Sequence, residues 1–128
     1  MSNVPDELKY SAEHEWIATT EDPSVVRVGI TDFAQDALGE VVYVEHAEVG
    51  ATVAAGDVVG EVESTKSVSD IYAPVAGEIV AVNSELEADP GSVNSDPYAA
   101  GWLFEVKLAE NSGVESLLSA EDYKNQVG

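Results

Sequence analysis

Lys66 is the residue whose type and setting point most directly to chemistry. It lies in the stretch EVESTKSVSDIYAP, residues 61–74, of a chain with four lysines and one arginine against 25 acidic residues. A lysine in a polar turn is most often only a solvated charge. A lysine that forms a Schiff base needs an apolar pocket that favours the neutral amine. The neighbouring carboxylates of Glu61, Glu63 and Asp70 favour the charged amine instead, which argues against a nucleophilic role.

A third role for Lys66 is a covalent attachment point. An enzyme that modifies a lysine needs the amine exposed, flanked by small residues and held in a fixed geometry, which a tight turn supplies. The small polar neighbours that leave such access are Ser64, Thr65, Ser67 and Ser69. In this role the protein makes no bonds of its own and carries a group on a tether.

The other candidate groups indicate structure rather than chemistry. The absence of cysteine excludes disulfides, thiolate metal sites and a cysteine nucleophile. His14 and His46 have no recognisable metal-ligand spacing, so no metal site is predicted. The large aromatic residues are expected in the core or at its rim, namely Trp16, Trp102 and Phe104.

The charge of the chain limits its partners. A formal net charge of -20 repels nucleic-acid phosphates and anionic lipids, because binding either needs clustered lysine and arginine. Two explanations of the acidity stay open: solubility, including life in a salt-rich cytoplasm, and docking to partners with basic faces. No stretch reaches the roughly 18 apolar residues of a membrane span, and the N-terminal MSNVPDELKY has no targeting pattern. We expect a cytoplasmic, prokaryotic protein.

The length of the chain and its turn residues predict the domain organisation. At 128 residues the chain suits one domain, spanning 1–128, with its own hydrophobic core. We predict an N-terminal leader over 1–9, a β core over 10–108 and a C-terminal helical segment over 112–125. Short β segments separated by glycine, proline and asparagine favour a small barrel or sandwich for the core.

Local signals place the first elements of the core and the C-terminal helix. Alternating patterns predict strands over 15–19 and 25–30, joined as a hairpin. A short helix is predicted over 31–38, where Thr31 can cap it and Gly39 can end it. In the C-terminal segment Ser112 and Glu115 form a capping box, and the helix is expected to break near Ser119.

An internal sequence repeat places Lys66 between two similar strands. GEVVYVE at 39–45 recurs as GEIVAVN at 77–83, and EVE at 61–63 has a counterpart in EVK at 105–107. A repeat of roughly 40 residues suits a set of about four strands. Lys66 is therefore predicted at the tip of the hairpin that connects the two copies.

Four blocks of the sequence resemble the H-protein family of the glycine cleavage system. They are EVESTKSVSDIYAPVAGEIVAVN at 61–83, SAEHEW at 11–16, VGITDFAQDALGEVVYVE at 28–45 and VNSDPYAAGW at 93–102. The blocks stand in the family's order and spacing, and the resemblance extends from Leu8 to Tyr123. It implies a mainly β fold, a flattened barrel-sandwich hybrid of the lipoyl/biotinyl carrier type, with short flanking helices and a C-terminal helix.

The resemblance implies that Lys66 carries lipoic acid in amide linkage. As in the family, the carrier would accept the aminomethyl group of glycine from a pyridoxal-phosphate glycine decarboxylase, the P protein. A tetrahydrofolate-dependent aminomethyltransferase, the T protein, would take the group over, and dihydrolipoyl dehydrogenase, the L protein, would reoxidise the carrier. Lipoate-attaching enzymes are further implied partners. We expect a monomer without catalytic activity of its own.

The family also folds its loaded arm into a surface cleft, where acidic side chains pair with the terminal ammonium group. By position, the resemblance assigns this role to the carboxylates of Glu15 and Asp70, with Ser67 and Ser69 as hydrogen-bond partners. Hydrogen-bonded carboxylates around a cation are physically sound. His14, next to Glu15, is expected to be a hydrogen-bonded polar residue, and a part in holding the cleft is the less common alternative.

Three other functions remain as alternatives. An H-like lipoate relay that donates lipoyl groups to 2-oxoacid dehydrogenases would use the same Lys66. A biotin carrier is disfavoured because methionines usually flank its lysine, whereas Thr65 and Ser67 flank Lys66. An autonomous enzyme is the weakest alternative, since no nucleophile with a suitable base and no metal cluster is evident.

Overall fold

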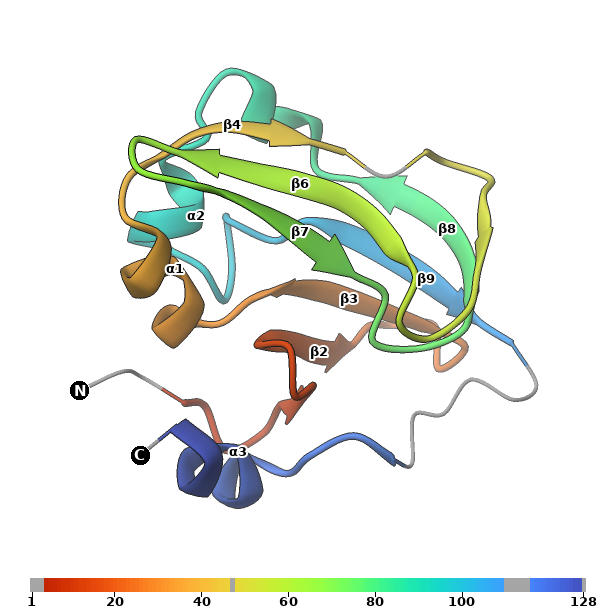
Figure 1. The fold of residues 1–128 in the computed structure, drawn as a ribbon. Coiled ribbons are helices and arrows are strands. Elements are labelled where there is room, and N and C mark those ends of the chain that lie inside the picture. The colour runs from red at the N-terminus through yellow and green to blue at the C-terminus, as the bar shows by residue number, and fades with distance from the viewer. Residues whose placement is uncertain (1–3, 47, 110–115, 128) are drawn as a thin grey trace.

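Two β-sheets packed face to face form the body of the molecule (Figure 1). A computed structural model describes residues 4–46, 48–109 and 116–127. Within these ranges one sheet has six strands in the order β1-β2-β3-β9-β8-β5, and the other has three in the order β4-β6-β7. The strands are β1 (Lys9–Tyr10), β2 (Glu15–Thr19), β3 (Val25–Ile30), β4 (Val41–Glu45), β5 (Thr52–Val53), β6 (Val58–Ser64), β7 (Val68–Tyr72), β8 (Gly77–Val82) and β9 (Phe104–Leu108).

The main hydrophobic core lies between the two sheets. Side chains alternate between the faces of a strand, so that in β6 Val62 is fully buried while Glu63 is exposed. The buried members of this core are Ile17, Val26, Val28, Ile30, Val41, Val44, Val62, Ile71, Val75, Ile79, Leu86, Val93, Leu103, Phe104 and Val106. The valine and isoleucine side chains among them are β-branched and fit a pleated surface. Burial of the whole set is the main force that holds the sheets together.

The predicted first hairpin is confirmed at both strands. β2 spans Glu15–Thr19 and β3 spans Val25–Ile30, and the two are antiparallel neighbours. The register pairs Glu15 with Ile30 at one end and Thr19 with Val26 at the other. The turn residues EDPS therefore end one strand and start the next, as the sequence pattern indicates.

The two copies of the internal repeat fold into matching antiparallel strand pairs. The first copy forms β4 paired with β6, and the second forms β8 paired with β9. Each pair has a register shift at the equivalent place, between Val41 and Tyr43 in the first copy and between Ile79 and Ala81 in the second. Such bulges bend and twist a strand locally. The shared bulge shows that the sequence repeat is also a structural repeat, rather than a chance match of valine-rich strands.

Helix α1 (Asp32–Leu38) has both of its predicted ends. Thr31 is the N-cap, since its Oγ1 accepts a hydrogen bond of 3.2 Å from the backbone N–H of Ala34. Gly39 ends the helix with φ of 85°, a conformation that favours glycine because it lacks a Cβ. The interval between β8 and β9 contains a short 3-10 helix, η1 (Ser84–Glu87), and helix α2 (Ser92–Ser95).

The C-terminal helix α3 (Ala120–Val127) begins later than the sequence predicts. The proposed capping box at Ser112 and Glu115 lies outside the described residues. Leu118 forms an antiparallel bridge with Tyr10, with N–H to oxygen distances of 2.9 and 2.7 Å. This pairing holds Leu118 extended, so the helix can begin only after it. Ser119 then caps the helix through its Oγ, which accepts from the N–H of Asp122 at 3.2 Å.

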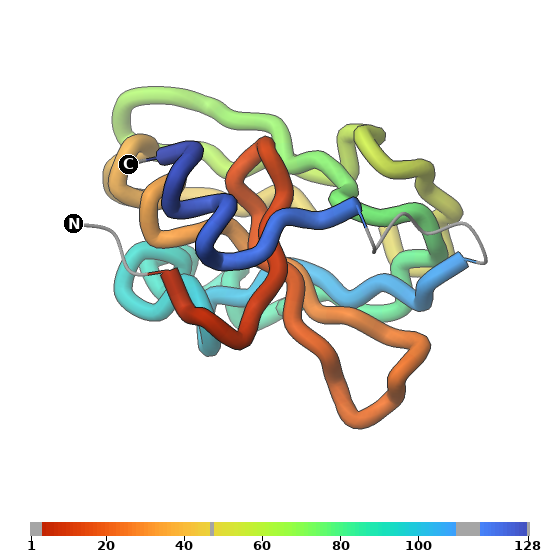
Figure 2. The backbone as a smooth tube through the Cα atoms, turned by 90° about the horizontal axis from the view of Figure 1, so that it is seen from below, coloured from red at the N-terminus to blue at the C-terminus, as the bar shows by residue number. Residues whose placement is uncertain are grey.

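Helix α3 lies against the N-terminal segment that contains β1 (Figure 2). It covers a second hydrophobic cluster, on the outer face of the larger sheet. The Tyr123 ring stacks on the Tyr10 ring with centroids 4.7 Å apart, and both residues are fully buried. Trp16 is buried in the same cluster, whereas Phe104 lies in the main core, and Trp102 packs at the rim. The predicted packing role of these aromatic residues is confirmed. No helix within the described ranges is long and apolar enough to span a membrane.

Candidate functional site

A tight turn joins β6 to β7 (Figure 1). Lys66 lies in this turn and is exposed. The N–H of Ser64 donates to the carbonyl oxygen of Ser67 at 2.8 Å, which leaves Thr65 and Lys66 at the tip. Neither tip residue has positive φ, so the turn lacks the backbone twist usual in two-residue hairpins. Ser64 compensates, because its buried Oγ accepts from the N–H groups of Ser67 and Lys66 at 3.1 and 3.3 Å.

The turn is also fixed from the side by the residues that follow α1. The N–H of Thr65 donates to the carbonyl oxygen of Glu40 at 3.0 Å. The aliphatic part of Lys66 rests on Gly39, where a Cβ would come within 3.1 Å of Lys66 Cε. The lysine is therefore presented by a defined backbone while its side chain remains exposed, which is what a modifying enzyme requires.

A cleft of about 250 Å³ lies between β2, α1 and β7. One wall is apolar and comes mainly from α1, with Phe33, Ala34, Ala37 and Leu38. The polar lining comes from Glu13, His14, Glu15, Ser69 and Asp70. Such a cleft suits a ligand with an apolar stem and a cationic end, since the stem can lie along α1 while carboxylates attract the charge.

Glu15 is the buried carboxyl group of this cleft, with a residue exposure of 1%. Its Oε1 accepts a hydrogen bond of 2.6 Å from Ser11 Oγ, and its Oε2 accepts one of 3.3 Å from the N–H of Tyr72 on β7. Burial raises the pKa of Glu15 to about 7, against the lowering effect of the two hydrogen bonds. Near neutral pH a nearby cation can therefore shift this carboxyl group from its protonated to its ionised form.

His14 connects the cleft to the C-terminal helix. Its backbone has φ of 72°, and its Nδ1 lies 2.7 Å from the hydroxyl oxygen of Tyr123. The same hydroxyl lies 2.7 Å from Oγ1 of Thr31, the N-cap of α1. Burial lowers the pKa of His14 from its usual value. His14 is therefore the expected hydrogen-bonded polar histidine, and its partner on α3 has no signal in the sequence.

The structure brings together most of the residues assigned to the cleft. Glu15, Ser69 and Asp70 line it, and Lys66 is four residues from Asp70 along β7 and its preceding turn. Ser67 instead lies in the exposed turn, where its backbone N–H and carbonyl group hold the hairpin. The apolar wall from α1 was not assigned, although its clustering on one side of the helix was a usable signal. The contact from Tyr72 has no local signal, because it joins strands of different sheets.

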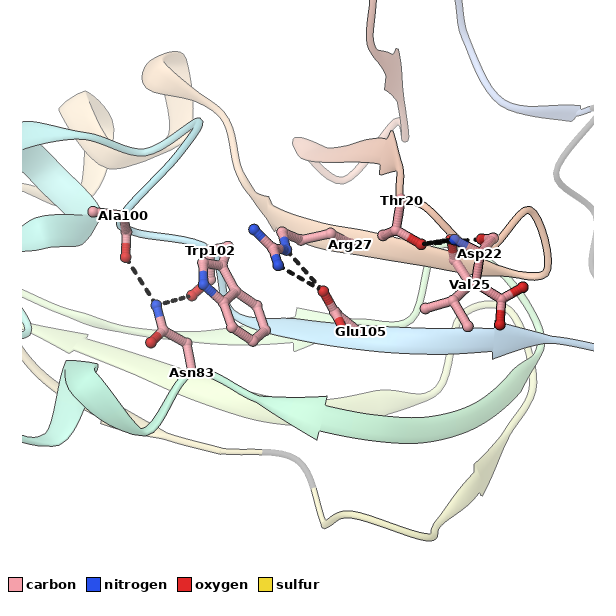
Figure 3. A network of polar contacts seen from close by, with 8 residues as sticks. All are labelled: Thr20, Asp22, Val25, Arg27, Asn83, Ala100, Trp102 and Glu105. Carbon is pink, nitrogen blue, oxygen red and sulfur yellow. Dashed lines mark hydrogen bonds and ion pairs between the residues drawn. The ribbon is translucent and has the colours of Figure 1, made fainter.

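A larger open groove of about 710 Å³ on the outer face of the six-stranded sheet lacks this chemistry. Its one cationic lining residue is already paired with a carboxylate, since Arg27 Nη2 lies 2.8 Å from Glu105 Oε2 (Figure 3). The Arg27 guanidinium also lies 4.5 Å from the centre of the Trp102 ring. This region is held together by its own contacts, and none of the residues assigned to binding lines it.

An exposed hairpin lysine beside an acidic cleft on a small two-sheet sandwich is the arrangement expected of a covalent carrier domain. The chain belongs to the glycine cleavage H-protein family, because the model of that family matches residues 8–128. A "Glycine cleavage system H protein" of Micrococcus luteus is 65% identical over 99% of both chains. One of Mycobacterium avium is 57% identical over 99% of this chain and 98% of its own.

A solved structure supports the same assignment of the fold. The crystal structure of a glycine cleavage system H protein from Mycobacterium marinum has a TM-score of 0.88 and is 46% identical. The match covers 98% of this chain and 99% of that one. The expected fold, a mainly β sandwich with few helices and a helix at the C-terminal end, is confirmed.

Proposed function

We propose that this protein carries lipoic acid on Lys66 and serves as the shuttle of the glycine cleavage system. In this role it takes the aminomethyl group of glycine from the pyridoxal-phosphate glycine decarboxylase to the tetrahydrofolate-dependent aminomethyltransferase. Dihydrolipoyl dehydrogenase then reoxidises it. The observation that carries the proposal is the presentation of Lys66, an exposed amine on a turn fixed by Ser64 and Glu40.

The residues around Lys66 fit a lipoyl group. The amine is exposed, its neighbours are small, and the cleft offers an apolar wall for an alkyl chain. When bound, the lipoyl group supplies a disulfide that takes up the one-carbon unit and is reduced. The protein's own part is to hold the arm at a defined point and to shield its loaded end from water.

Glu15 and Asp70 supply the charge that would hold the loaded end. An aminomethyl group ends in an ammonium ion, which favours ionised carboxylates within a few ångströms. Glu15 has a pKa of about 7, so binding of the cation would be coupled to loss of its proton. Ser11 and Tyr72 hold the Glu15 carboxyl group in place, while Asp70 and Ser69 lie on the opposite strand of the cleft.

The protein would perform no catalysis itself. The chemistry belongs to its partners, and the carrier brings the same arm to each of them at high effective concentration. A net charge of -20 favours fast docking to partners with basic faces, including the enzymes that attach lipoate. The proposal places this exchange in the cytoplasm and has the carrier act as a monomer. Cell fractionation and analytical ultracentrifugation test those two points.

The acidic cleft favours this function over a lipoate relay. A relay passes the lipoyl group on and needs no site for an ammonium ion, whereas Glu15, Asp70 and the apolar wall of α1 provide one. Both functions use Lys66, so the discriminating feature is the cleft.

Exchange of labelled carbon dioxide into glycine tests the function. The lipoylated protein should support exchange by a glycine decarboxylase, and Lys66→Arg should support none. Asp70→Asn should raise the apparent KM of the decarboxylase for the carrier, or it should speed the release of formaldehyde from the aminomethyl group of the loaded carrier. A lipoylated protein that supports no exchange, yet donates its lipoyl group to a 2-oxoacid dehydrogenase subunit, would establish the relay instead.

A further inference from the structure

The side chain of Asn94 on α2 ties together the segment that follows α1. Its Nδ2 donates to the carbonyl oxygen of Gly39 at 2.8 Å and to Oε1 of Gln35 at 3.0 Å. Its Oδ1 accepts from the N–H of Val41 at 2.8 Å. One side chain therefore fixes the end of α1 and the start of β4, from more than fifty residues away along the chain.

The same segment supports the Lys66 turn, and we call residues 39–41 the platform. The carbonyl oxygen of Glu40 accepts the N–H of Thr65 at 3.0 Å. Val41 pairs with Ser64 in the sheet, and the Lys66 side chain rests on Gly39. These three contacts hold the turn from the side through the platform.

The link between Asn94 and Thr65 crosses a single peptide unit. The N–H of Val41 and the carbonyl group of Glu40 belong to one planar trans peptide and point in opposite directions. Asn94 binds the N–H on one side, so the carbonyl group is turned toward Thr65 on the other. Gly39, directly before this unit, has φ of 85° and no side chain to restrict it. Without Asn94 this peptide unit would lose the hydrogen bond to its N–H, one of the contacts that fix its orientation.

We propose that Asn94 is a positioning residue for acylation of Lys66. Through the Glu40–Val41 peptide it sets the place of the Thr65–Lys66 turn relative to α1, the geometry that a lipoate-attaching enzyme must recognise. The inference rests on the proposed function, because it assumes that Lys66 is the attachment site. Asn94 would influence the acylation of Lys66 without contacting the amine.

Asn83 provides a matched control in the second copy of the repeat. Its Nδ2 donates to the carbonyl oxygens of Ala100 and Trp102 at 2.8 and 2.9 Å (Figure 3). It is buried, with an exposure of 3%, and like Asn94 it ties a loop to a strand. Its contacts do not reach the platform, so its loss should lower stability without affecting the Lys66 turn.

The test is enzymatic lipoylation of the full-length apo protein by a lipoate–protein ligase with lipoate and ATP. Asn94→Ala should lower kcat/KM for the protein substrate by about fivefold or more, the factor expected from one lost orienting hydrogen bond. Asn83→Ala should stay within about twofold of the unaltered protein. Acylation of Lys66 by a small N-hydroxysuccinimide ester should proceed at the same rate in all three, because the amine itself is unchanged. The Thr65 amide should exchange faster with deuterium only in Asn94→Ala.

The inference is overturned if Asn94→Ala matches Asn83→Ala in ligase kinetics, or if Thr65 exchange is unchanged. If Asn94→Ala does not fold, Asn94→Ser repeats the comparison, since the shorter side chain loses the same contacts but leaves a polar group. Failure of the proposed function looks different. In that case the unaltered protein itself is not lipoylated, or it is lipoylated at a residue other than Lys66.

Discussion

The two copies of the repeat begin alike and end differently. Each forms an antiparallel strand pair with a bulge at the equivalent place. In the first copy β6 continues into an exposed turn, and its surroundings are a platform and an acidic cleft. In the second copy β9 pairs with β3 as well as β8, and Arg27, Glu105, Trp102 and Asn83 hold its surroundings together. One copy presents Lys66 to partners, and the other completes the fold that holds it.

The equivalent glycines Gly39 and Gly77 give the largest expected difference between the copies. A Cβ on Gly77 would lie 2.1 Å from the carbonyl oxygen of Lys107, so the paired backbones would have to move apart. A Cβ on Gly39 would have the flexible Lys66 side chain as its nearest neighbour, at 3.1 Å, although the positive φ of Gly39 adds strain. We expect Gly77→Ala to cost more than about 3 kcal/mol of unfolding free energy and Gly39→Ala about 1–3 kcal/mol. Urea unfolding of both variants measures this, and the reverse order would contradict the comparison.

The buried Glu15 should make stability depend on pH. Its folded pKa is raised from 4.5 to about 7, so the folded state holds the proton more tightly than the unfolded state between these values. Its contribution to stability is therefore fully present below pH 4.5 and is lost as pH rises through 7, by about 3 kcal/mol at most. The free energy of unfolding, measured across this pH range, should fall in the unaltered protein. In Glu15→Gln it should not show that loss.

Asp70→Asn is the control for Glu15→Gln, because Asp70 is an exposed carboxylate of the same cleft. The loss of stability that Glu15 causes as pH rises from 4.5 through 7 should remain in Asp70→Asn. Equal effects of the two substitutions would mean that burial of Glu15 does not set the pKa.

Ser64 should matter more to the Lys66 turn than Ser67. Ser64→Ala removes an Oγ that accepts from two backbone N–H groups, which should cost about 1–2 kcal/mol and slow enzymatic lipoylation. Ser67 holds the turn through its backbone, so Ser67→Ala should change unfolding by less than about 0.5 kcal/mol. Chemical unfolding and ligase kinetics compare the pair, and similar losses would show that the Ser64 hydroxyl does not organise the turn.

A smaller effect is expected at Arg27 on β3, which pairs with Glu105 of the second copy. Arg27→Met loses the ion pair with Glu105 and the contact with Trp102, which should cost about 1 kcal/mol because the guanidinium is partly exposed. Lys124→Met, which loses a more exposed pair with Asp6, should cost nearly nothing. Lipoylation should be unaffected in both. A marked loss of lipoylation in Arg27→Met would extend the site into the second copy.

The sequence predicts those features that depend on local signals. The bounds of β2 and β3 follow from alternation, and those of α1 from a capping threonine and a terminal glycine. The sequence repeat places Lys66 between two strands. The cleft residues Glu15, Ser69 and Asp70 follow from the resemblance to a family. These features depend on neighbours in the chain or on recognisable motifs.

The features that escape prediction depend on contacts between distant segments. The start of α3 is set by pairing of Leu118 with Tyr10, and the pKa of Glu15 by burial under a strand of the other sheet. In the sequence nothing distinguishes Asn94 from other polar residues of its segment, and only the position of α2 in the fold places it against the platform. Periodicity and capping rules carry no information on such contacts, because their partners are far away in the sequence.

The central claim is that Lys66, held out by the first copy of the repeat, carries lipoic acid. Intact-mass analysis of the protein purified from its native host, followed by mapping of the modified peptide, tests it most directly. The account predicts one lipoyl amide on Lys66 and no such increment in Lys66→Arg. A biotin increment, or a lipoyl group that remains in Lys66→Arg, would contradict it.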